Sequence, residues 1–220
     1  LLSNSPGWCK IISETIYRQI GNGSQGVRLM KKWITIILAV CLSAVLTACS
    51  LGNTETQTAG EETAKNPNVL IVYYSDSDIM GHVAEAIASK TGGRIVEIRR
   101  QVPFPADLKQ AMQAAREEAV NHTLPPIATK IPNANSYKTV FLCYPLWWGT
   151  MPMPVFTFLQ ETNLTGVNLI PVAGSPKGDM GQSLTDLEIH APGAQIKDHY
   201  FINTPKKAED LNQWLEKLGY

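Results

Sequence analysis

TVFLCYPLWWGTMPMPVFTFL, residues 139–159, is the stretch of sequence that determines the fold, because its residue pattern changes twice. Residues 139–144 are β-branched, aromatic and apolar, which is typical of a short strand buried on both faces. Residues 145–153 contain two prolines, one glycine and two adjacent tryptophans, a composition that breaks regular structure and carries a large aromatic surface. From residue 155 onward the apolar residues recur at helical spacing. The stretch therefore predicts a strand, an aromatic loop and a helix.

The same alternation of strands and helices runs through residues 68–220. Strands are expected at 69–74, 94–99, 139–144 and 168–173, and within 195–202. Helices are expected at 82–89, at 106–120 with Glu117 and Glu118 on its solvated face, after Pro154, near 182–189, and from a Thr204 cap with Pro205 in the first turn. Strands that alternate with helices form a parallel sheet covered on both faces, and ligands bind at the carboxyl ends of its strands. We expect an α/β fold with a three-layer, doubly wound, five-stranded parallel sheet.

Residues 30–49 show the features of a secretory signal peptide in the usual order. Met30 is followed by two lysines and an apolar core at 33–45, which is too short for a membrane span. The core ends in LTAC, residues 46–49, which resembles the lipobox of bacterial lipoproteins. We therefore expect Met30 to be the true start, residues 1–29 to be non-native upstream translation, and Cys49 to carry a lipid that anchors the protein outside the cytoplasm. The alternative is a buried apolar helix with an incidental cysteine.

The segment that follows Cys49 has a different composition. Residues 50–67 are rich in Gly, Thr, Glu, Gln and Asn, so they are expected to form a flexible tether to a domain at 68–220. Five of the 19 basic residues but only one of the 19 acidic residues precede Cys49. The mature chain is thus mildly acidic, which argues against nucleic acid as a partner.

The remaining cysteine and the histidines give no sign of a metal site or a nucleophile. Cys9 and Cys41 belong to the leader, which leaves Cys143 in a predicted buried strand, where a small core residue is expected. The four histidines have no paired cysteine or carboxylate at metal-ligand spacing, so we predict no metal site.

The motif P-L-W-W-G-T-M-P-x-P-V-F-T-F-L resembles the isoalloxazine-side loop of flavodoxin-like proteins, in the branch that reads P-x-W-W-G. The resemblance covers residues 68–220 and implies the strand order 2-1-3-4-5 and FMN as the cofactor. It implies that Trp147 and Trp148 pack against the flavin ring and that the backbone around the turn hydrogen-bonds the polar edge of the ring. The residues implied in this loop are Pro145, Leu146, Trp147, Trp148 and Gly149.

The family's phosphate loop, roughly Y-S-x-T-G-N-T, aligns without gaps with residues 74–80. Ser75 and Ser77 are kept in kind, whereas Asp78, Ile79 and Met80 replace glycine, asparagine and threonine. A carboxylate about 6 Å from a phosphate costs roughly 1–3 kcal/mol, so we expect weakened phosphate binding. In the alternative interpretation, residues 76–78 cap the helix themselves, and the Asp78 carboxylate substitutes for the anion in an FMN-free state.

The third loop, residues 173–181, stands where the family has a T-x-G-G-S-G-like run. Gly174 and Ser175 are the candidate cofactor contacts here. Gly181 and Ser183 fit the end of the family pattern, whereas Pro176, Lys177 and Asp179 depart from it.

Together these features predict an FMN-binding electron-transfer protein or reductase at the outer face of a membrane. Its partner would be an unidentified redox protein or a small acceptor such as a quinone. No side chain is needed as a catalytic acid or base, because the flavin carries the redox chemistry. The alternative is a flavodoxin-like shell without FMN, which uses the Trp147/Trp148 cleft to bind a partner or another ligand.

Overall fold

A parallel sheet with the strand order β2-β1-β3-β4-β5 forms the centre of the domain. The computed structural model describes residues 64–75, 77–176 and 178–220, so the predicted leader, Cys49 and most of the tether lie outside the described residues. The strands are β1 (Val69–Tyr73), β2 (Arg94–Glu97), β3 (Thr139–Pro145), β4 (Asn168–Gly174), β5 (Gln195–Ile196) and β6 (Tyr200–Ile202). Both β5 and β6 pair in parallel with β4, so they share the fifth strand position. The predicted fold and strand order are confirmed.

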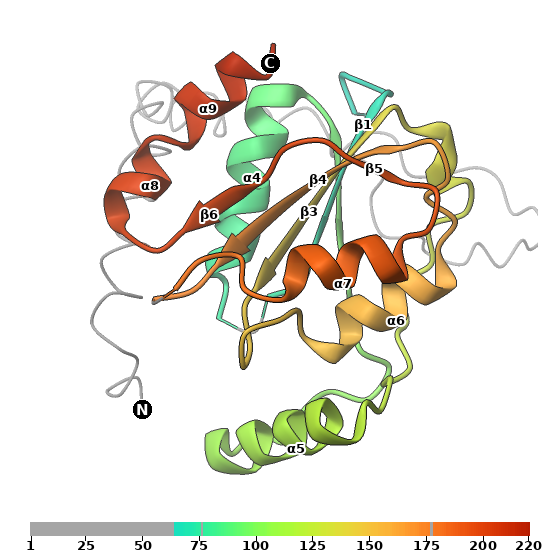
Figure 1. Cartoon of the computed structure of the whole chain (residues 1–220), viewed down its shortest axis with the longest axis vertical. Helices are drawn as coiled ribbons and strands as arrows, with labels where there is room; N and C mark the ends of the chain where they lie inside the picture. The colour runs from blue at the N-terminus through green and yellow to red at the C-terminus, as the bar shows by residue number, and fades with distance from the viewer. Residues whose placement is uncertain (1–63, 76, 177) are drawn as a thin grey trace, which may run out of the picture. The chain divides into compact units, whose positions relative to one another are not determined.

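Two hydrophobic clusters lie on opposite faces of the sheet, because successive strand residues point to opposite sides. In β3, Phe141 and Cys143 belong to one cluster, and Leu142 and Tyr144 belong to the other. The helices are α4 (Ile79–Thr91), α5 (Leu108–Asn121), α6 (Met153–Glu161), α7 (Ser183–His190), α8 (Pro205–Glu209) and α9 (Leu211–Lys217). Helices α4 and α9 cover the Phe141 face, whereas α6 and α7 cover the Leu142 face (Figure 1).

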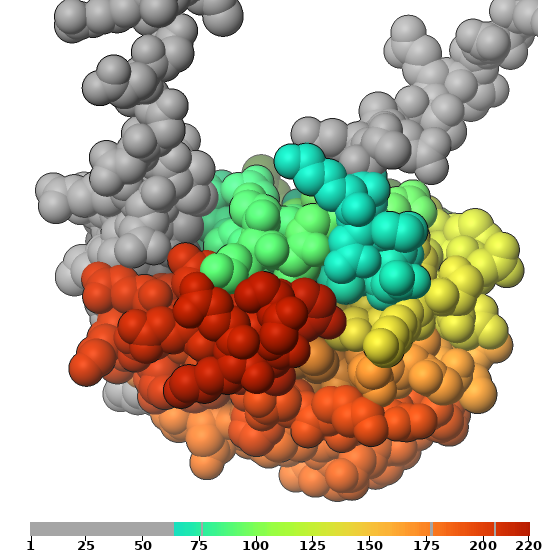
Figure 2. Space-filling view, turned by 90° about the horizontal axis from the view of Figure 1, so that it is seen from above, coloured from blue at the N-terminus to red at the C-terminus, as the bar shows by residue number. Residues whose placement is uncertain are grey.

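The first and last helices of the described residues, α4 and α9, meet on the surface of the domain. In Figure 2 the red C-terminal residues lie beside the green residues of α4. The Lys90 ammonium contacts the Glu216 carboxylate there at 2.8 Å. The sequence predicts a single closing helix from Thr204, and Thr204 does cap α8 by accepting a hydrogen bond from the Lys207 amide at 3.3 Å. The structure differs from this prediction at Asp210, where α8 ends and α9 begins.

Helix α5 is the least buried of the long helices. Its cap is Asp107, whose carboxylate accepts a hydrogen bond from the Gln110 amide at 2.9 Å. Ala115 is its one buried residue. Figure 1 shows α5 away from the sheet, below the loop that leads from β3 to α6. No helix within the described part of the chain is long and apolar enough to cross a bilayer.

Candidate ligand site at the carboxyl edge of the sheet

Three loops meet where β1, β3 and β4 end, and backbone hydrogen bonds join two of them. The amide of Leu146 donates to the carbonyl of Gly174 at 2.8 Å, and the amide of Gln182 donates to the carbonyl of Gly149 at 2.8 Å. A Cβ atom on Gly174 would lie 2.9 Å from the Met80 sulfur, so the missing side chain makes room for the first turn of α4. The structure therefore brings together the three predicted segments at one edge.

The loop after β1 contains the position at which the family pattern has glycine. Asp78, aligned with that glycine, adopts left-handed dihedral angles of φ 60° and ψ −14° at the N-cap of α4. Its exposed side chain forms no capping hydrogen bond, in contrast to the interpretation in which Asp78 caps the helix. Asp76, the other carboxylate in that interpretation, lies outside the described residues.

Two serines of this loop differ in their surroundings. The Ser75 hydroxyl oxygen is buried and has no hydrogen-bond partner in the described structure. Ser77 is exposed, and its carbonyl accepts a hydrogen bond from the Ile79 amide at 2.8 Å. Ile79 and Met80 direct their side chains to the core, so these side chains are not available to a ligand. A buried hydroxyl without a partner is costly, and a phosphate at the start of α4 would supply the missing acceptor.

The tryptophan loop is a tight turn. Trp147 and Thr150 exchange backbone hydrogen bonds of 2.9 and 3.1 Å. Trp148 and Gly149 between them have φ values of 50° and 91°, as a type I′ turn requires. The Thr150 hydroxyl also donates to the Asp186 carboxylate on α7, which ties the turn to the body of the domain.

The two tryptophans do not share one environment. Trp147 is half-buried, and its ring meets Tyr74 edge-on with centroids 5.7 Å apart. Trp148 is 53% exposed at the tip of the turn, and its ring centroid lies 6.0 Å from that of Trp147. Trp148 thus offers a free aromatic face, whereas Trp147 supports it from within.

Residues near the end of the third loop hold it against the tryptophan turn. A Cβ atom on Gly181, which has a φ of 55°, would lie 2.4 Å from the Gly149 carbonyl oxygen. The Ser183 hydroxyl donates to the Met180 carbonyl at 2.5 Å and accepts from the Tyr144 hydroxyl at 3.2 Å. The sequence pattern matched Gly181 and Ser183 to the family but gave no reason for this contact between loops.

The predicted contacts Gly174 and Ser175 lie at the base of this loop, at the end of β4. Both are half-buried, and the Ser175 amide donates to the Ile202 carbonyl at 3.1 Å. Ser175 therefore has its side chain, rather than its amide, available for a ligand.

The buried titratable groups beneath the site are neutral. Cys143 is fully buried, and this burial raises the pKa of its thiol, which agrees with the predicted core role. Burial likewise raises the pKa of Tyr144, although the hydrogen bond with Ser183 opposes that shift. In the described ranges, no group of three or more His, Cys, Asp or Glu side chains is placed to hold a metal ion.

A separate hollow of about 360 Å³ lies between β6 and the C-terminal helices and contains none of the predicted site residues. Two of its polar side chains are paired: the Trp214 indole donates to Asp198 at 3.1 Å, and the Tyr200 hydroxyl donates to the Lys207 carbonyl at 2.7 Å. Burial raises the pKa of Tyr200 to about 12, so this hydroxyl remains a donor at neutral pH.

The fold and the edge define a doubly wound α/β protein in which the start of a helix lies beside an aromatic loop, an arrangement suited to a planar ligand that carries a phosphate. The chain belongs to the flavodoxin family, whose match covers residues 68–218. No curated protein sequence is significantly similar to it.

Solved structures share the fold. A candidate flavoprotein from Bacteroides eggerthii is 25% identical with a TM-score of 0.60, and the match covers 70% of this chain and 99% of that one. Another from Bacteroides uniformis is 20% identical with a TM-score of 0.59, covering 69% and 99% of the two chains. A flavoprotein from Lactobacillus acidophilus in complex with FMN is 21% identical with a TM-score of 0.55, covering 67% and 98%.

Proposed function

We propose that the domain binds FMN at the carboxyl edge of its sheet and transfers electrons, as a carrier or as a reductase of small acceptors such as quinones. The observation that carries the proposal is the Ser75 hydroxyl in the loop before α4. It is buried and has no hydrogen-bond partner in the described structure. Family membership and the FMN complex of the Lactobacillus acidophilus protein support the choice of ligand.

The residues at the edge fit the parts of this cofactor. Ser75 and the start of α4 suit the phosphate, because the helix dipole favours an anion there, whereas the Asp78 charge at the N-cap opposes it. The exposed face of Trp148 suits the ring, and the backbone of the 146–149 turn suits its polar edge. FMN would supply the electron transfer. The chain's own residues bind it, orient it and shield it from water.

The cellular context and the redox partner are part of the same proposal. A lipid on Cys49 would place the domain at the outer face of a membrane, where it would meet a redox protein or a small acceptor. A shell without FMN is the second candidate, and the exposed charge of Asp78 at the helix start favours it, because this charge repels a phosphate. In that case the Trp147/Trp148 surface would bind a partner or another ligand.

Riboflavin, which lacks the phosphate, separates the contribution of the phosphate loop from that of the tryptophan loop. The Ser75→Ala variant is expected to bind FMN about tenfold more weakly than the parent, because a charge-assisted hydrogen bond is lost. Its affinity for riboflavin should not change. Fluorescence titration of both ligands measures the two dissociation constants.

Ser89→Ala is the matched control, since Ser89 is an exposed serine near the end of α4, distant in sequence from the loop that contains Ser75. It should bind both ligands as the parent does. If Ser75→Ala leaves the affinity for FMN unchanged, the phosphate does not contact this hydroxyl and the assignment of the loop is wrong.

A further inference from the structure

Arg100 lies at the base of a long excursion of the chain, residues 99–128, that contains α5. Residues 99–101 run antiparallel to residues 126–128, with the Gln101 amide donating to the Pro126 carbonyl at 2.9 Å and the Ala128 amide donating to the Arg99 carbonyl at 2.8 Å. This short pairing closes the excursion, so Arg100 stands where the loop before α5 and the segment after it come together.

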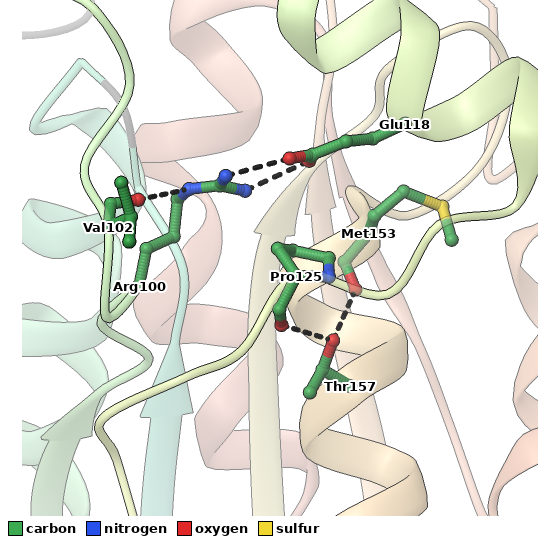
Figure 3. A network of polar contacts seen from close by, with 6 residues as sticks. All are labelled: Arg100, Val102, Glu118, Pro125, Met153 and Thr157. Carbon is green, nitrogen blue, oxygen red and sulfur yellow. Dashed lines mark hydrogen bonds and ion pairs between the residues drawn. The ribbon is translucent and has the colours of Figure 1, made fainter.

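The Arg100 side chain is fixed by three different contacts. Its two terminal nitrogens donate to the Glu118 carboxylate on α5 at 2.9 and 2.7 Å, and its Nε donates to the Val102 carbonyl at 3.0 Å (Figure 3). The guanidinium carbon lies 3.9 Å from the centroid of the Phe104 ring. The side chains of Arg100 and Glu118 are only 13% and 17% exposed, so solvent screens this ion pair less than a surface pair. The sequence predicts that Glu118 lies on a solvated face, and this prediction is wrong.

Phe104 connects the Arg100 side chain to the candidate site through its contact with Trp147. Its ring centroid lies 6.2 Å from that of Trp147, which in turn contacts Tyr74 and Trp148. Contacts thus continue from Arg100 through Phe104 to the tryptophan turn and to the loop after β1. Because α5 buries only Ala115, few other contacts on α5 can hold the excursion in place.

We propose that Arg100 is a positioning residue of the candidate site, which holds Phe104 against Trp147 and thereby sets the orientation of the Trp147 ring. The planar guanidinium stacks on Phe104 while its edge engages Glu118 with two parallel hydrogen bonds, and a lysine ammonium cannot do both. The consequence for FMN rests on the proposed function. The positioning of Trp147 by Arg100 is independent of the proposed function.

Near-UV circular dichroism of the purified protein tests the positioning, because coupled aromatic rings give bands that depend on their mutual geometry. Arg100→Lys keeps the charge but loses the stack and the paired hydrogen bonds, and Phe104→Leu removes the ring while leaving the ion pair. Both variants should lose part of the tryptophan bands with an unchanged far-UV spectrum, and both should bind FMN about tenfold more weakly.

Arg99→Lys is the matched control. Arg99 is the neighbouring arginine, its side chain is 68% exposed, and it pairs with Glu97 at 2.7 Å rather than with α5. This variant should keep the parent's bands and the parent's affinity for FMN.

The two readouts separate the possible failures. Unchanged tryptophan bands in both Arg100→Lys and Phe104→Leu overturn the positioning role, whatever the affinity for FMN. Absence of FMN binding in the parent overturns the proposed function instead, and altered bands in the two variants then still support the control of Trp147 by Arg100. If Arg100→Lys fails to fold, the tryptophan bands of Phe104→Leu are compared with those of Arg99→Lys. Loss of bands in Phe104→Leu alone then supports the positioning role, and unchanged bands in both variants overturn it.

Discussion

Replacement of Asp78 by glycine is expected to tighten FMN binding by about one order of magnitude. Two effects act in the same direction. The change removes a negative charge beside the expected phosphate position, and it places glycine in a left-handed conformation (φ 60°) that costs glycine nothing. The free energy of unfolding should change little, because the relief of backbone strain is offset by the greater freedom of glycine in the unfolded chain. FMN titration at low and high salt measures the change in affinity and the part of it that is electrostatic.

Asp78→Asn separates the two causes. Asparagine has the same shape as aspartate and also tolerates the left-handed conformation, but it carries no charge. If the charge dominates, the asparagine and glycine variants bind FMN equally well, and the gain shrinks at high salt. An affinity that neither substitution changes would mean that no phosphate lies near the start of α4.

Gly181→Ala is expected to weaken FMN binding by more than tenfold and to lower the free energy of unfolding by about 1–3 kcal/mol. The new methyl group would lie 2.4 Å from the Gly149 carbonyl oxygen, and alanine would be strained at a φ of 55°. The third loop and the tryptophan turn would then have to separate, which removes the Gln182–Gly149 hydrogen bond. Chemical denaturation and FMN titration measure the two effects.

Gly178→Ala is the control that separates backbone strain from the clash between the loops. Gly178 lies in the same loop with a φ of 86°, but a Cβ atom there would have no neighbour within 4 Å. Its alanine variant should show the backbone strain alone and keep most of its affinity for FMN. Equal losses of affinity in the two variants would show that the contact between the loops does not organise the site.

Local sequence patterns predicted the sheet, because apolar runs of strand length alternate with helical segments. They placed all five strand positions and the cap at Thr204, which depend on neighbouring residues. They did not show that the fifth position is split into β5 and β6, because the 195–202 run alone does not reveal which of its residues can pair with β4.

The differences between the sequence predictions and the structure come from contacts between residues distant in sequence and from the backbone conformation of single residues. Glu118 appears in a polar helix and was predicted to be solvated, yet its partner Arg100 lies 18 residues earlier. Likewise, Asp78 has the residue type of a helix cap, and only the backbone shows that it occupies the left-handed position of a glycine. The contact of Gly181 with Gly149 depends on how two loops meet, which neither loop's sequence determines.

The N-terminal predictions concern residues that the structure does not describe. The start at Met30, the lipid on Cys49 and the tether at 50–67 stay predictions from the sequence.

Titration of the purified protein with FMN, followed by quenching of flavin fluorescence, shows whether the domain binds this cofactor. We expect saturable quenching with one FMN per chain and a dissociation constant of about 1 μM or below, with riboflavin binding more weakly. Absence of quenching at FMN concentrations of about 1 mM would contradict this expectation and would favour the shell without FMN, whose tryptophan turn binds something else.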